Sequence, residues 1–471
     1  MLEKVQLINS YLSDYVLVIL LISVGVFYTI KTKFVQIRFF KYGFKKVFAN
    51  IDLNGEKQKG SMSSFQALAT AIAAQVGTGN IIGASGAILT GGPGAIFWMW
   101  VIAFFGMATI YAEAVLSQKT RKIHKDHTVS GGPVYYITTA FKGRVGKIMA
   151  SFFAIAIILA LGFFGCMVQS NSIGSTFYNA FGVPSFVVGF VLVFICLLIF
   201  VGGLNRLAYV TEKIVPIMAS IFLLGSLYVL IIRFRFLPET FYLIFKYAFK
   251  PESIIGGGFG YAIKTAVSQG AKRGLFSNEA GMGSTPHAHA LANVKNPHEQ
   301  GVVAMMGVFI DTFVVLTFNA LVIISTLYVG ANAPLSNGYQ GEVLTIFNKA
   351  NLAQSAFSSI MGDSIGFKFV AICLFFFAFS TILSWNLFGR INMDWLFGKN
   401  SRLLYIAISI IFIFLGTIMS NDLVWELSDM FNQLMVIPNA LALFVLSSMV
   451  IKEIPSKNKQ INQKKHRHSS K

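Results

Sequence analysis

The chain has 471 residues, of which 55% are hydrophobic and only 12% are charged, and its mean hydropathy is +0.67. Soluble domains carry about 25% charged residues, so this composition excludes a soluble globular protein and predicts an all-α polytopic membrane protein. The formal net charge is +19, but the cations lie in short loops and in the tail, which indicates a lipid bilayer rather than a nucleic acid as the partner.

Apolar runs of about 17–25 residues, the length that crosses a bilayer as a helix, recur along the whole chain. The first run, Tyr15–Ile30, lacks a small-residue cleavage site and is expected to be a membrane anchor rather than a signal peptide. About eleven spans are predicted, at residues 14–32, 63–90, 93–116, 148–171, 185–204, 212–232, 257–285, 301–328, 366–389, 402–420 and 424–450.

Cations in the loops between these spans indicate how the chain crosses the membrane. Loops 33–62 and 117–147 carry seven Lys or Arg residues each and are separated by two spans, which places both in the cytoplasm. Segments 172–184 and 330–365 have almost no cations and fall outside. By the same count of Lys and Arg residues, loop 389–402 and the basic tail are expected in the cytoplasm.

One loop, 233–256, fits this pattern poorly, because it should be external and yet carries four cations: Arg233, Arg235, Lys246 and Lys250. The other loops agree with one another. The expectation is therefore a multi-pass protein of the cell (plasma) membrane, with its N-terminus outside and its C-terminus in the cytoplasm.

The second predicted span contains a polar, glycine-rich stretch, Ala71–Gly83, which continues to Gly91–Gly94. Gln75, Thr78, Asn80 and three glycines lie in its middle. Glycine weakens a helix, and freed backbone groups persist in a bilayer only where they line a cavity or meet protein. A broken helix here would bind a small polar solute or an ion. The alternative is a Gly-rich face that packs against a neighbouring helix.

A second interruption, Gly270–Pro286, falls in the seventh span. Interrupted helices at corresponding places in two halves are typical of transporters with inverted repeats. This repeat is inferred from layout, since the halves share no evident residue-level identity. The expected divisions are an extra N-terminal helix with its loop at 1–62, five-helix repeats at 63–235 and 236–450, and a basic tail at 451–471.

Four stretches resemble a known family, the alanine/glycine:cation symporters, also called sodium:alanine symporters. They are Gly77–Ile81 with Gly91–Trp100, Gly131–Tyr136, Lys272–Ser284 with His287–His289, and Phe379–Trp385. The similarity spans about residues 60–450. This family is similar in fold to the bacterial leucine transporter, with one extra helix before a ten-helix core that has two broken helices. The resemblance implies import of alanine or glycine with Na⁺ by alternating access.

The same resemblance implies a substrate site at the two interruptions. Thr78 and Gly79 would present N–H groups to the substrate carboxylate, as helix termini do for anions. Carbonyl groups near Ala74 and Phe276 would meet the substrate ammonium group.

Further side chains are candidate contacts in that site. Phe276, Met282 and Trp385 are the expected walls of a shallow pocket, although core packing is the alternative for each. Gln169 is polar at membrane depth and would contact substrate or link helices. Glu279 stands where a substrate contact would fall, and it could instead carry a proton.

The coupling ion has its own candidate residues. Ser380 and Thr381 are adjacent hydroxyls in an apolar helix, and they match the position at which the leucine-transporter fold holds one sodium. Carbonyls of Ala73, Val76 and Phe377 would complete the shell of this Na⁺ site. The alternative is that the hydroxyls bond the carbonyls of their own helix.

Ionisable side chains at membrane depth are costly and call for partners. Glu113, near the end of its span, is expected to pair with a loop cation, and Asp311 needs a partner among apolar neighbours. Glu279 is expected to pair with Lys272 or Arg273.

No hydrolytic or redox constellation and no Walker-type loop is visible, so the sequence predicts no enzyme and no ATP-driven pump. Two alternatives stay open. The first is a proton-coupled transporter of the same fold, in which Glu279 or Asp311 would titrate. The second is a channel or a non-transporting amino-acid sensor.

Overall fold

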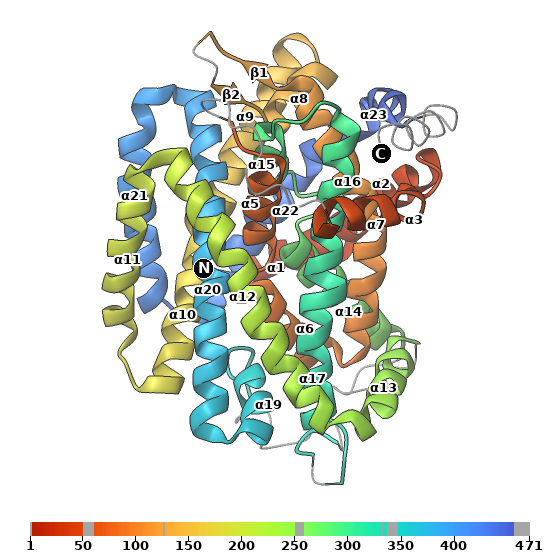
Figure 1. Ribbon diagram of the computed structural model, residues 1–471, viewed down its shortest axis with the longest axis vertical. Coiled ribbons are helices and arrows are strands. Elements are labelled where there is room, and N and C mark those ends of the chain that lie inside the picture. Colours follow the sequence, from red (N-terminus) through yellow and green to blue (C-terminus); the bar gives the residue numbers. More distant parts are fainter. Residues whose placement is uncertain are drawn as a thin grey trace, which may run out of the picture.

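The computed structural model describes residues 2–49, 61–125, 128–249, 259–331, 333–336 and 347–455. Helices make up nearly all the regular structure of these residues, as predicted, and run between two ends of the molecule (Figure 1). A short antiparallel sheet of β1 (Lys122–Ile123) and β2 (Val129–Ser130), which was not predicted, lies at one end. Lys57, Lys59, Lys250 and residues 456–471 of the predicted tail lie outside the described residues.

The first half of the chain contains four π-helical segments among its α-helices. Its elements are α1 (Leu2–Tyr11), η1 (Leu12–Leu17), α2 (Val18–Lys31), α3 (Val35–Arg38), α4 (Phe40–Phe44), η2 (Lys45–Ala49), α5 (Ser64–Gln75), η3 (Gly79–Gly83), α6 (Ala84–Gly91), α7 (Gly94–Thr120), α8 (Pro133–Ala140), α9 (Gly143–Ile157), η4 (Ile158–Gly165), α10 (Cys166–Phe181), α11 (Ser185–Val201) and α12 (Gly203–Ile232).

The second half begins with a short 3₁₀ turn and contains one further π-helical segment, η6. Its elements are η5 (Phe234–Phe236), α13 (Leu237–Phe249), α14 (Phe259–Asn278), α15 (Pro286–Leu291), α16 (Pro297–Val308), η6 (Phe309–Leu316), α17 (Thr317–Leu327), α19 (Leu352–Met361), α20 (Asp363–Phe397), η7 (Lys399–Ser401), α21 (Arg402–Ile418), α22 (Asn421–Val445) and α23 (Ser447–Glu453).

Seven helices of the described chain are long and apolar enough to cross a membrane. The number rises to nine if two bent pairs, α5 with η3–α6 and α22 with α23, each count as one span. Both predicted interruptions are present. The helix axis bends by 43° between α5 and η3–α6, and α14 ends at Asn278 seven residues before α15 begins.

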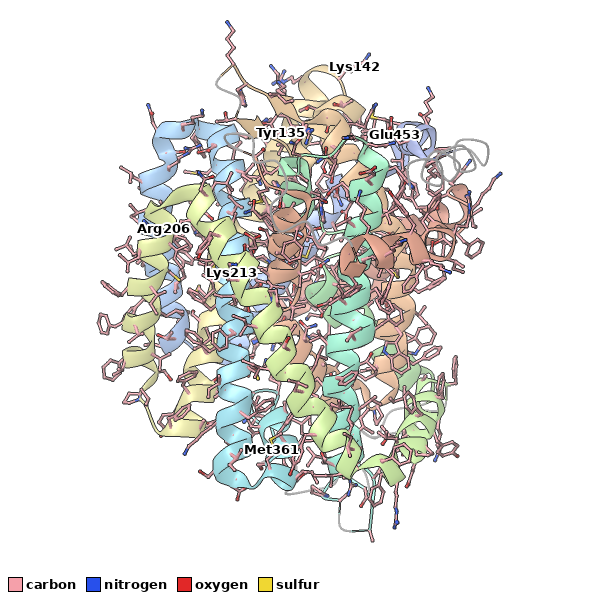
Figure 2. The ribbon with its side chains drawn as sticks, in the orientation of Figure 1. Tyr135, Lys142, Arg206, Lys213, Met361 and Glu453 are labelled. Carbon is pink, nitrogen blue, oxygen red and sulfur yellow. The ribbon has the colours of Figure 1, made fainter. Side chains whose placement is uncertain are left out.

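The two ends of the molecule divide the connecting segments into two groups. Figure 1 places β1, β2, α15 and α23 at one end and α13 and α19 at the other. Figure 2 shows the same division through Lys142 and Glu453 on one side and Met361 on the other. The segments that charge counting assigned to the same side of a membrane therefore lie at the same end.

The described part of the poorly fitting loop, residues 233–249, lies at the same end as α19, and one of its cations bonds within the protein. The Arg233 guanidinium donates to the carbonyl of Ser325 through Nε at 2.9 Å and to that of Val329 through Nη2 at 2.7 Å. These carbonyls lie at the end of α17, where the helix leaves acceptors unpaired. Because Arg233 caps a helix, its position in this loop does not indicate on which side of the membrane the loop lies.

Helix α5 lies within the bundle, since its residues from Gln66 to Gln75 are all buried. A capping box begins it: the Ser63 hydroxyl accepts from the Gln66 N–H, and the Gln66 side chain accepts from the Ser63 N–H. A helix that is buried on every side brings its end into contact with several neighbours at once. The first interruption is therefore placed among α10, α14, α20 and η6.

Candidate functional site

The first interruption is a short break in which the backbone turns away from α5. Val76 ends the helix with φ −79° and ψ 86°. The freed N–H groups are met by side chains: that of Gly77 donates to Asn80 Oδ1 at 3.0 Å, and that of Thr78 donates to Gln169 Oε1 at 3.2 Å. Of the expected substrate residues, the structure therefore brings Thr78 and Gln169 together.

Three buried polar atoms at this break have no hydrogen-bond partner within the described part of the chain. One is an acceptor, Gln75 Oε1, and two can donate, the Thr78 hydroxyl and the Gln169 amide nitrogen. Buried polar groups are nearly always paired, so each such group needs an explanation. A hydroxyl and an amide N–H side by side are suited to donate to one carboxylate.

The expected ion residues meet at the same break. The Thr381 hydroxyl of α20 lies 2.8 Å from the Ala73 carbonyl and 3.4 Å from that of Ala74. It also lies 3.0 Å from the carbonyl of Phe377 on its own helix, to which Ser380 donates at 2.9 Å. The helix-internal bonds that were the alternative are thus present, and Thr381 reaches across to α5 as well.

A glycine makes this approach possible. A Cβ atom added at Gly77 would lie 2.4 Å from the Thr381 hydroxyl oxygen. Val76, the remaining expected ion residue, is buried at the end of α5 beside this contact. Carbonyl and hydroxyl oxygens are the ligands that hard cations prefer, so this group of residues fits Na⁺ chemically.

The two interruptions are in contact. A Cβ atom added at Gly79 would lie 2.9 Å from the Cα of Ser277, and Ser277 follows Phe276 on α14. The Phe276 ring meets the Trp385 ring edge-on, with 5.6 Å between centroids. Gly79, Phe276 and Trp385 are therefore close, as expected of a shared pocket, whereas Met282 is buried farther along the second interruption.

The predicted partner of Glu279 is wrong. Its carboxylate accepts from the Ser284 hydroxyl and from the Trp385 indole N–H, and its backbone has a φ of +57°, a region that non-glycine residues rarely adopt. Lys272 and Arg273 instead lie 2.9 and 3.2 Å from Asp429. Both cations precede the break on α14, so the distant helix α22 is within their reach and Glu279 is not.

The predicted loop cation for Glu113 is also wrong. The Glu113 carboxylate accepts from the backbone N–H groups of Gly281 at 3.2 Å and Gly283 at 3.0 Å. The Asn439 amide of α22 donates to it at 2.6 Å. The carboxylate thus pairs the N–H groups that the second interruption frees, a role for which the sequence holds no local signal.

Asp311 joins three elements at the crossing of the two interruptions. Its carboxylate accepts from the Asn80 amide at 2.6 Å, from the Ser277 hydroxyl at 3.0 Å and from the Thr312 hydroxyl at 2.8 Å. The Asp311 carboxylate thus has the partner that the sequence called for, but this partner is a set of neutral hydrogen-bond donors. Among the described residues, no Lys or Arg lies within ion-pair distance of Asp311, Glu279 or Glu113.

One further aromatic side chain belongs to this region and was not predicted. Trp425 of α22 lies 4.8 Å from Phe276 between ring centroids. Sequence offers a weak signal for it, since Trp425 is one of only five tryptophans in the chain.

The chain is similar to known transporters. The family model described as the sodium:alanine symporter family matches residues 1–471. A sodium/alanine symporter, AgcS of Methanococcus maripaludis, is 38% identical over 455 residues, 96% of each chain. The amino-acid carrier protein AlsT of Bacillus subtilis is 36% identical over 457 residues, 96% of this chain and 92% of its own.

Among solved structures, the transporter MhsT in complex with L-phenylalanine aligns with a TM-score of 0.54 over 84% of this chain and 89% of its own. Only 16% of aligned residues are identical, so this likeness concerns the fold alone, which is that of the leucine transporter. The extent of the family match and of the relatives' identity leads to one conclusion: the chain belongs to the sodium:alanine symporter family.

Proposed function

We propose that this protein is a secondary active symporter that imports alanine or glycine together with Na⁺ by alternating access. One observation carries the proposal: the Thr381 hydroxyl lies 2.8 Å from the Ala73 carbonyl at the first interruption. This contact brings oxygen ligands suited to Na⁺ next to the segment expected to bind the amino acid. Membership of the family and the similarity to the sodium/alanine symporter AgcS support the same function.

The Na⁺ ion would be held by the hydroxyls of Ser380 and Thr381 and by the carbonyls of Ala73, Val76 and Phe377. Since α5 and α20 both supply ligands, the ion binds best when the two helices are close. A ligand shifts a conformational equilibrium by its difference in affinity between the states. Binding of Na⁺ would therefore favour the conformation in which the first interruption is ordered for substrate.

The substrate carboxylate would be bound by the Thr78 and Gly79 N–H groups, the Thr78 hydroxyl and the Gln169 amide. The Thr78 hydroxyl and the Gln169 amide nitrogen, two donors without a partner among the described residues, support that assignment. The substrate ammonium would meet the carbonyls near Ala74 and Phe276.

The remaining contacts would define the size of the substrate. Glu279 would add negative charge beside the ammonium group, while Phe276, Trp385 and Met282 would limit the pocket to a methyl group or less. The edge-on packing of Phe276 against Trp385 supports a tight wall.

The proposed architecture has eleven membrane spans. They are the nine candidate spans together with α11 and α14. We assign the first span to the N-terminal division 1–62 and the other ten to the repeats 63–235 and 236–450, with the tail at 451–471. The basic segments would lie in the cytoplasm, with the N-terminus outside the cell membrane.

Uptake of labelled alanine into proteoliposomes tests this function. Accumulation under an inward Na⁺ gradient at constant pH, lost when K⁺ replaces Na⁺, is the expected result. Saturation with alanine would exclude a channel. Absence of uptake by folded protein that still binds alanine would favour a sensor and contradict the proposal.

A second candidate is proton coupling, and it has its own observation. Glu113, Glu279 and Asp311 are fully buried carboxyl groups, and no Lys or Arg of the described chain lies within ion-pair distance of them. A buried carboxyl without a cation can be neutralised by a proton. Uptake that follows a pH gradient without Na⁺, and that is lost in Glu279→Gln or Asp311→Asn, would support this candidate over the first.

A further inference from the structure

The chain between α2 and α5 contains a helical segment at residues 35–48, to which the proposed function gives no role. This basic segment consists of α3, α4 and the π-helical turn η2. Figure 1 places α3 on the flank of the bundle, whereas β1 and β2 lie farther out, at the edge of the molecule. A position on the flank suits a helix that lies along a membrane surface.

One face of the basic segment packs against the bundle. Its buried residues recur at every fourth position, which places them on one side of a helix. They are Val35, Phe39, Gly43 and Val47. The Phe39 ring lies 4.6 Å from the His298 ring between centroids. A Cβ atom added at Gly43 would lie 2.8 Å from the Val302 side chain. This face is therefore fixed to α16.

A second face is apolar and exposed. Ile37, Phe44 and Phe48 are 61%, 47% and 49% exposed, and their spacing of seven and four residues puts them on one side of the helix. The Phe44 and Phe48 rings lie 4.6 Å apart between centroids. An exposed aromatic face on a helix outside the membrane spans is expected where that helix meets lipid.

A third face, next to the apolar one, is cationic. Arg38, Lys41 and Lys45 are spaced by three and four residues, and all three are exposed. The Arg38 guanidinium donates to the Thr32 carbonyl through Nη1 at 3.1 Å. No carboxylate of the described chain lies within ion-pair distance of these three cations. Together they attract an anion from outside.

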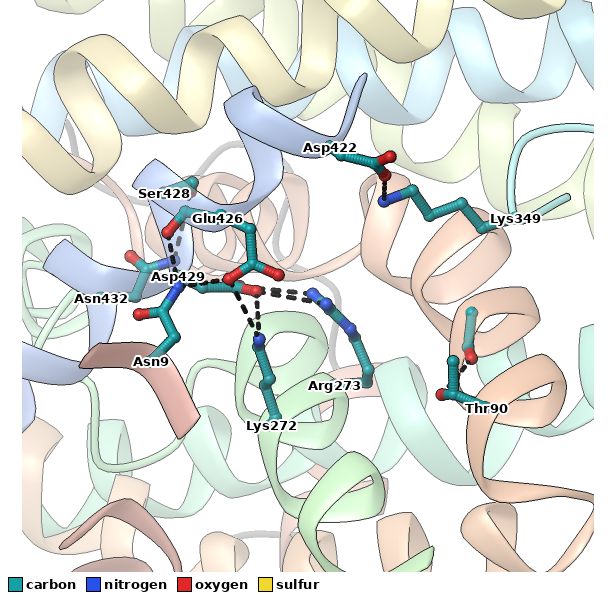
Figure 3. Close-up of polar contacts among 11 residues, drawn as sticks. Asn9, Thr90, Lys272, Arg273, Lys349, Asp422, Glu426, Ser428, Asp429 and Asn432 are labelled. Carbon is teal, nitrogen blue, oxygen red and sulfur yellow. Dashed lines mark hydrogen bonds and ion pairs between the residues drawn. The ribbon is translucent and has the colours of Figure 1, made fainter. Parts of the chain in front are cut away.

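Cations that face other helices of the protein have carboxylate partners. Figure 3 shows Lys272 and Arg273 pointing toward Asp429, and they lie 2.9 and 3.2 Å from its Oδ2 atom. Lys46 of the basic segment likewise pairs with Glu299 of α16. Where the cations of this segment face outward, the counter-charge has to come from outside the described chain.

An anionic phospholipid matches both outward faces at once. Its phosphate brings negative charge to the cationic face, and its acyl chains cover the apolar face. The two faces adjoin along the segment, as headgroups and hydrocarbon adjoin at a membrane surface. An acidic soluble protein would pair with the cations but would leave Phe44 and Phe48 without an apolar partner.

We propose that Arg38, Lys41 and Lys45 bind the headgroup of an anionic phospholipid, with Phe44 and Phe48 inserted among the acyl chains. The inference goes beyond the proposed transport, since lipid binding requires neither Na⁺ nor alanine. The lipid would also stabilise the position of α16, which continues into η6 and so leads to Asp311 at the crossing of the two interruptions.

The test is backbone hydrogen exchange over residues 35–48 of the full chain in phosphatidylcholine nanodiscs that contain increasing fractions of phosphatidylglycerol. Exchange in the wild type should slow as phosphatidylglycerol is added. In a variant with both Lys41→Gln and Lys45→Gln, the phosphatidylglycerol fraction for half-maximal protection should rise by about 10- to 30-fold, the loss expected for two cations near an anionic surface.

The matched control removes the same charge from the β1–β2 hairpin. Lys122 and Lys125 are also exposed, so a variant with Lys122→Gln and Lys125→Gln should keep the wild-type protection. Lys41→Arg with Lys45→Arg should keep it too, because the charge is retained. An unchanged lipid response in the Lys41→Gln, Lys45→Gln variant, or an equal loss in the hairpin variant, would overturn the proposal.

Two soluble probes separate a lipid from other anions. Glycerol 3-phosphate has the phosphate without acyl chains, and poly-glutamate stands for an acidic protein. Neither should protect residues 35–48 in phosphatidylcholine alone. Protection by either probe equal to that by phosphatidylglycerol would contradict a lipid site. Phe44→Ser with Phe48→Ser keeps all cations and should still weaken the response to phosphatidylglycerol, because the acyl chains lose their apolar contact.

Discussion

The two interruptions are broken helices at the centre of one bundle, but their freed backbone groups meet different partners. At the first, the N–H groups of Gly77 and Thr78 meet neutral amide oxygens. At the second, the N–H groups of Gly281 and Gly283 meet the carboxylate of Glu113. Each interruption also has buried polar atoms without a partner among the described residues, Thr78 Oγ1 at the first and Thr285 Oγ1 at the second.

This difference indicates that the two interruptions have different roles. A charged acceptor binds an N–H group more strongly than a neutral one does, so a ligand can displace the partners at the first interruption more easily than those at the second. The first interruption is suited to exchange protein contacts for ligand contacts. The second is suited to hold a fixed shape, with Glu279 in a backbone region that non-glycine residues rarely adopt.

The largest effect is expected from Glu113→Ala. The change leaves the N–H groups of Gly281 and Gly283 without their acceptor, at about 1–3 kcal/mol for each buried donor. The Asn439 amide also loses one of its two acceptors and keeps the Gly281 carbonyl. The melting temperature of the purified protein should fall steeply. Glu453→Ala is the control, because its ion pair with Lys119 is partly exposed and is worth about 0–1 kcal/mol. An equal fall in melting temperature in both variants would show that the Glu113 contacts stabilise the second interruption no more than a partly exposed ion pair does.

A smaller effect, on transport rather than on folding, is expected from Gly77→Ala. Its new Cβ would overlap the Thr381 hydroxyl, and overpacking of this kind costs about 1–3 kcal/mol. The initial rate of Na⁺-driven alanine uptake should drop by about 10- to 100-fold. In Gly86→Ala the new Cβ would lie 3.7 Å from Lys349, an ordinary contact, and uptake should persist. Normal uptake by Gly77→Ala would disprove close contact between α5 and α20 in the working protein.

Thr381→Val tests the ion residues of the first interruption. Loss of the hydroxyl removes one oxygen from the proposed ion shell, and the Na⁺ concentration for half-maximal uptake should rise by about tenfold, or ~1.4 kcal/mol. Ser172→Ala removes a buried hydroxyl that bonds the Val168 carbonyl of its own helix, and it should leave Na⁺ dependence as it is. Similar Na⁺ curves for Thr381→Val and wild type would place the ion elsewhere.

The smallest effect is expected from Gln169→Ala, which removes one neutral donor from the proposed carboxylate site. The dissociation constant for alanine should rise by about 5- to 10-fold, close to 1 kcal/mol. Gln354→Ala removes another buried amide, one that bonds the Thr176 and Phe367 carbonyls, and it should lower stability without changing affinity. A stronger loss of affinity in Gln354→Ala would show that buried amides act through stability alone.

Local composition was enough to predict much of the fold. Hydropathy identifies a helix that crosses a bilayer from its own residues, so the all-helical membrane class and most of the spans follow from the chain alone. The interruptions at Ala71–Gly83 and Gly270–Pro286 could be predicted for the same reason, because glycine and polar residues weaken a helix wherever it packs. Helices α13 and α19, which lie in the connecting loops, are 13 and 10 residues long, too short for a membrane span, and were not predicted.

Partner choice was decided by the tertiary structure. Lys272 lies seven residues from Glu279 in the chain, yet its ion pair is with Asp429 of α22. Glu113 bonds a turn that is 168 residues away. A buried charge must find a counter-group, but which group lies within reach depends on how helices cross. Sequence by itself determined that these charges needed partners and where the helices break. Packing alone determined which partners the charges and the freed backbone groups met.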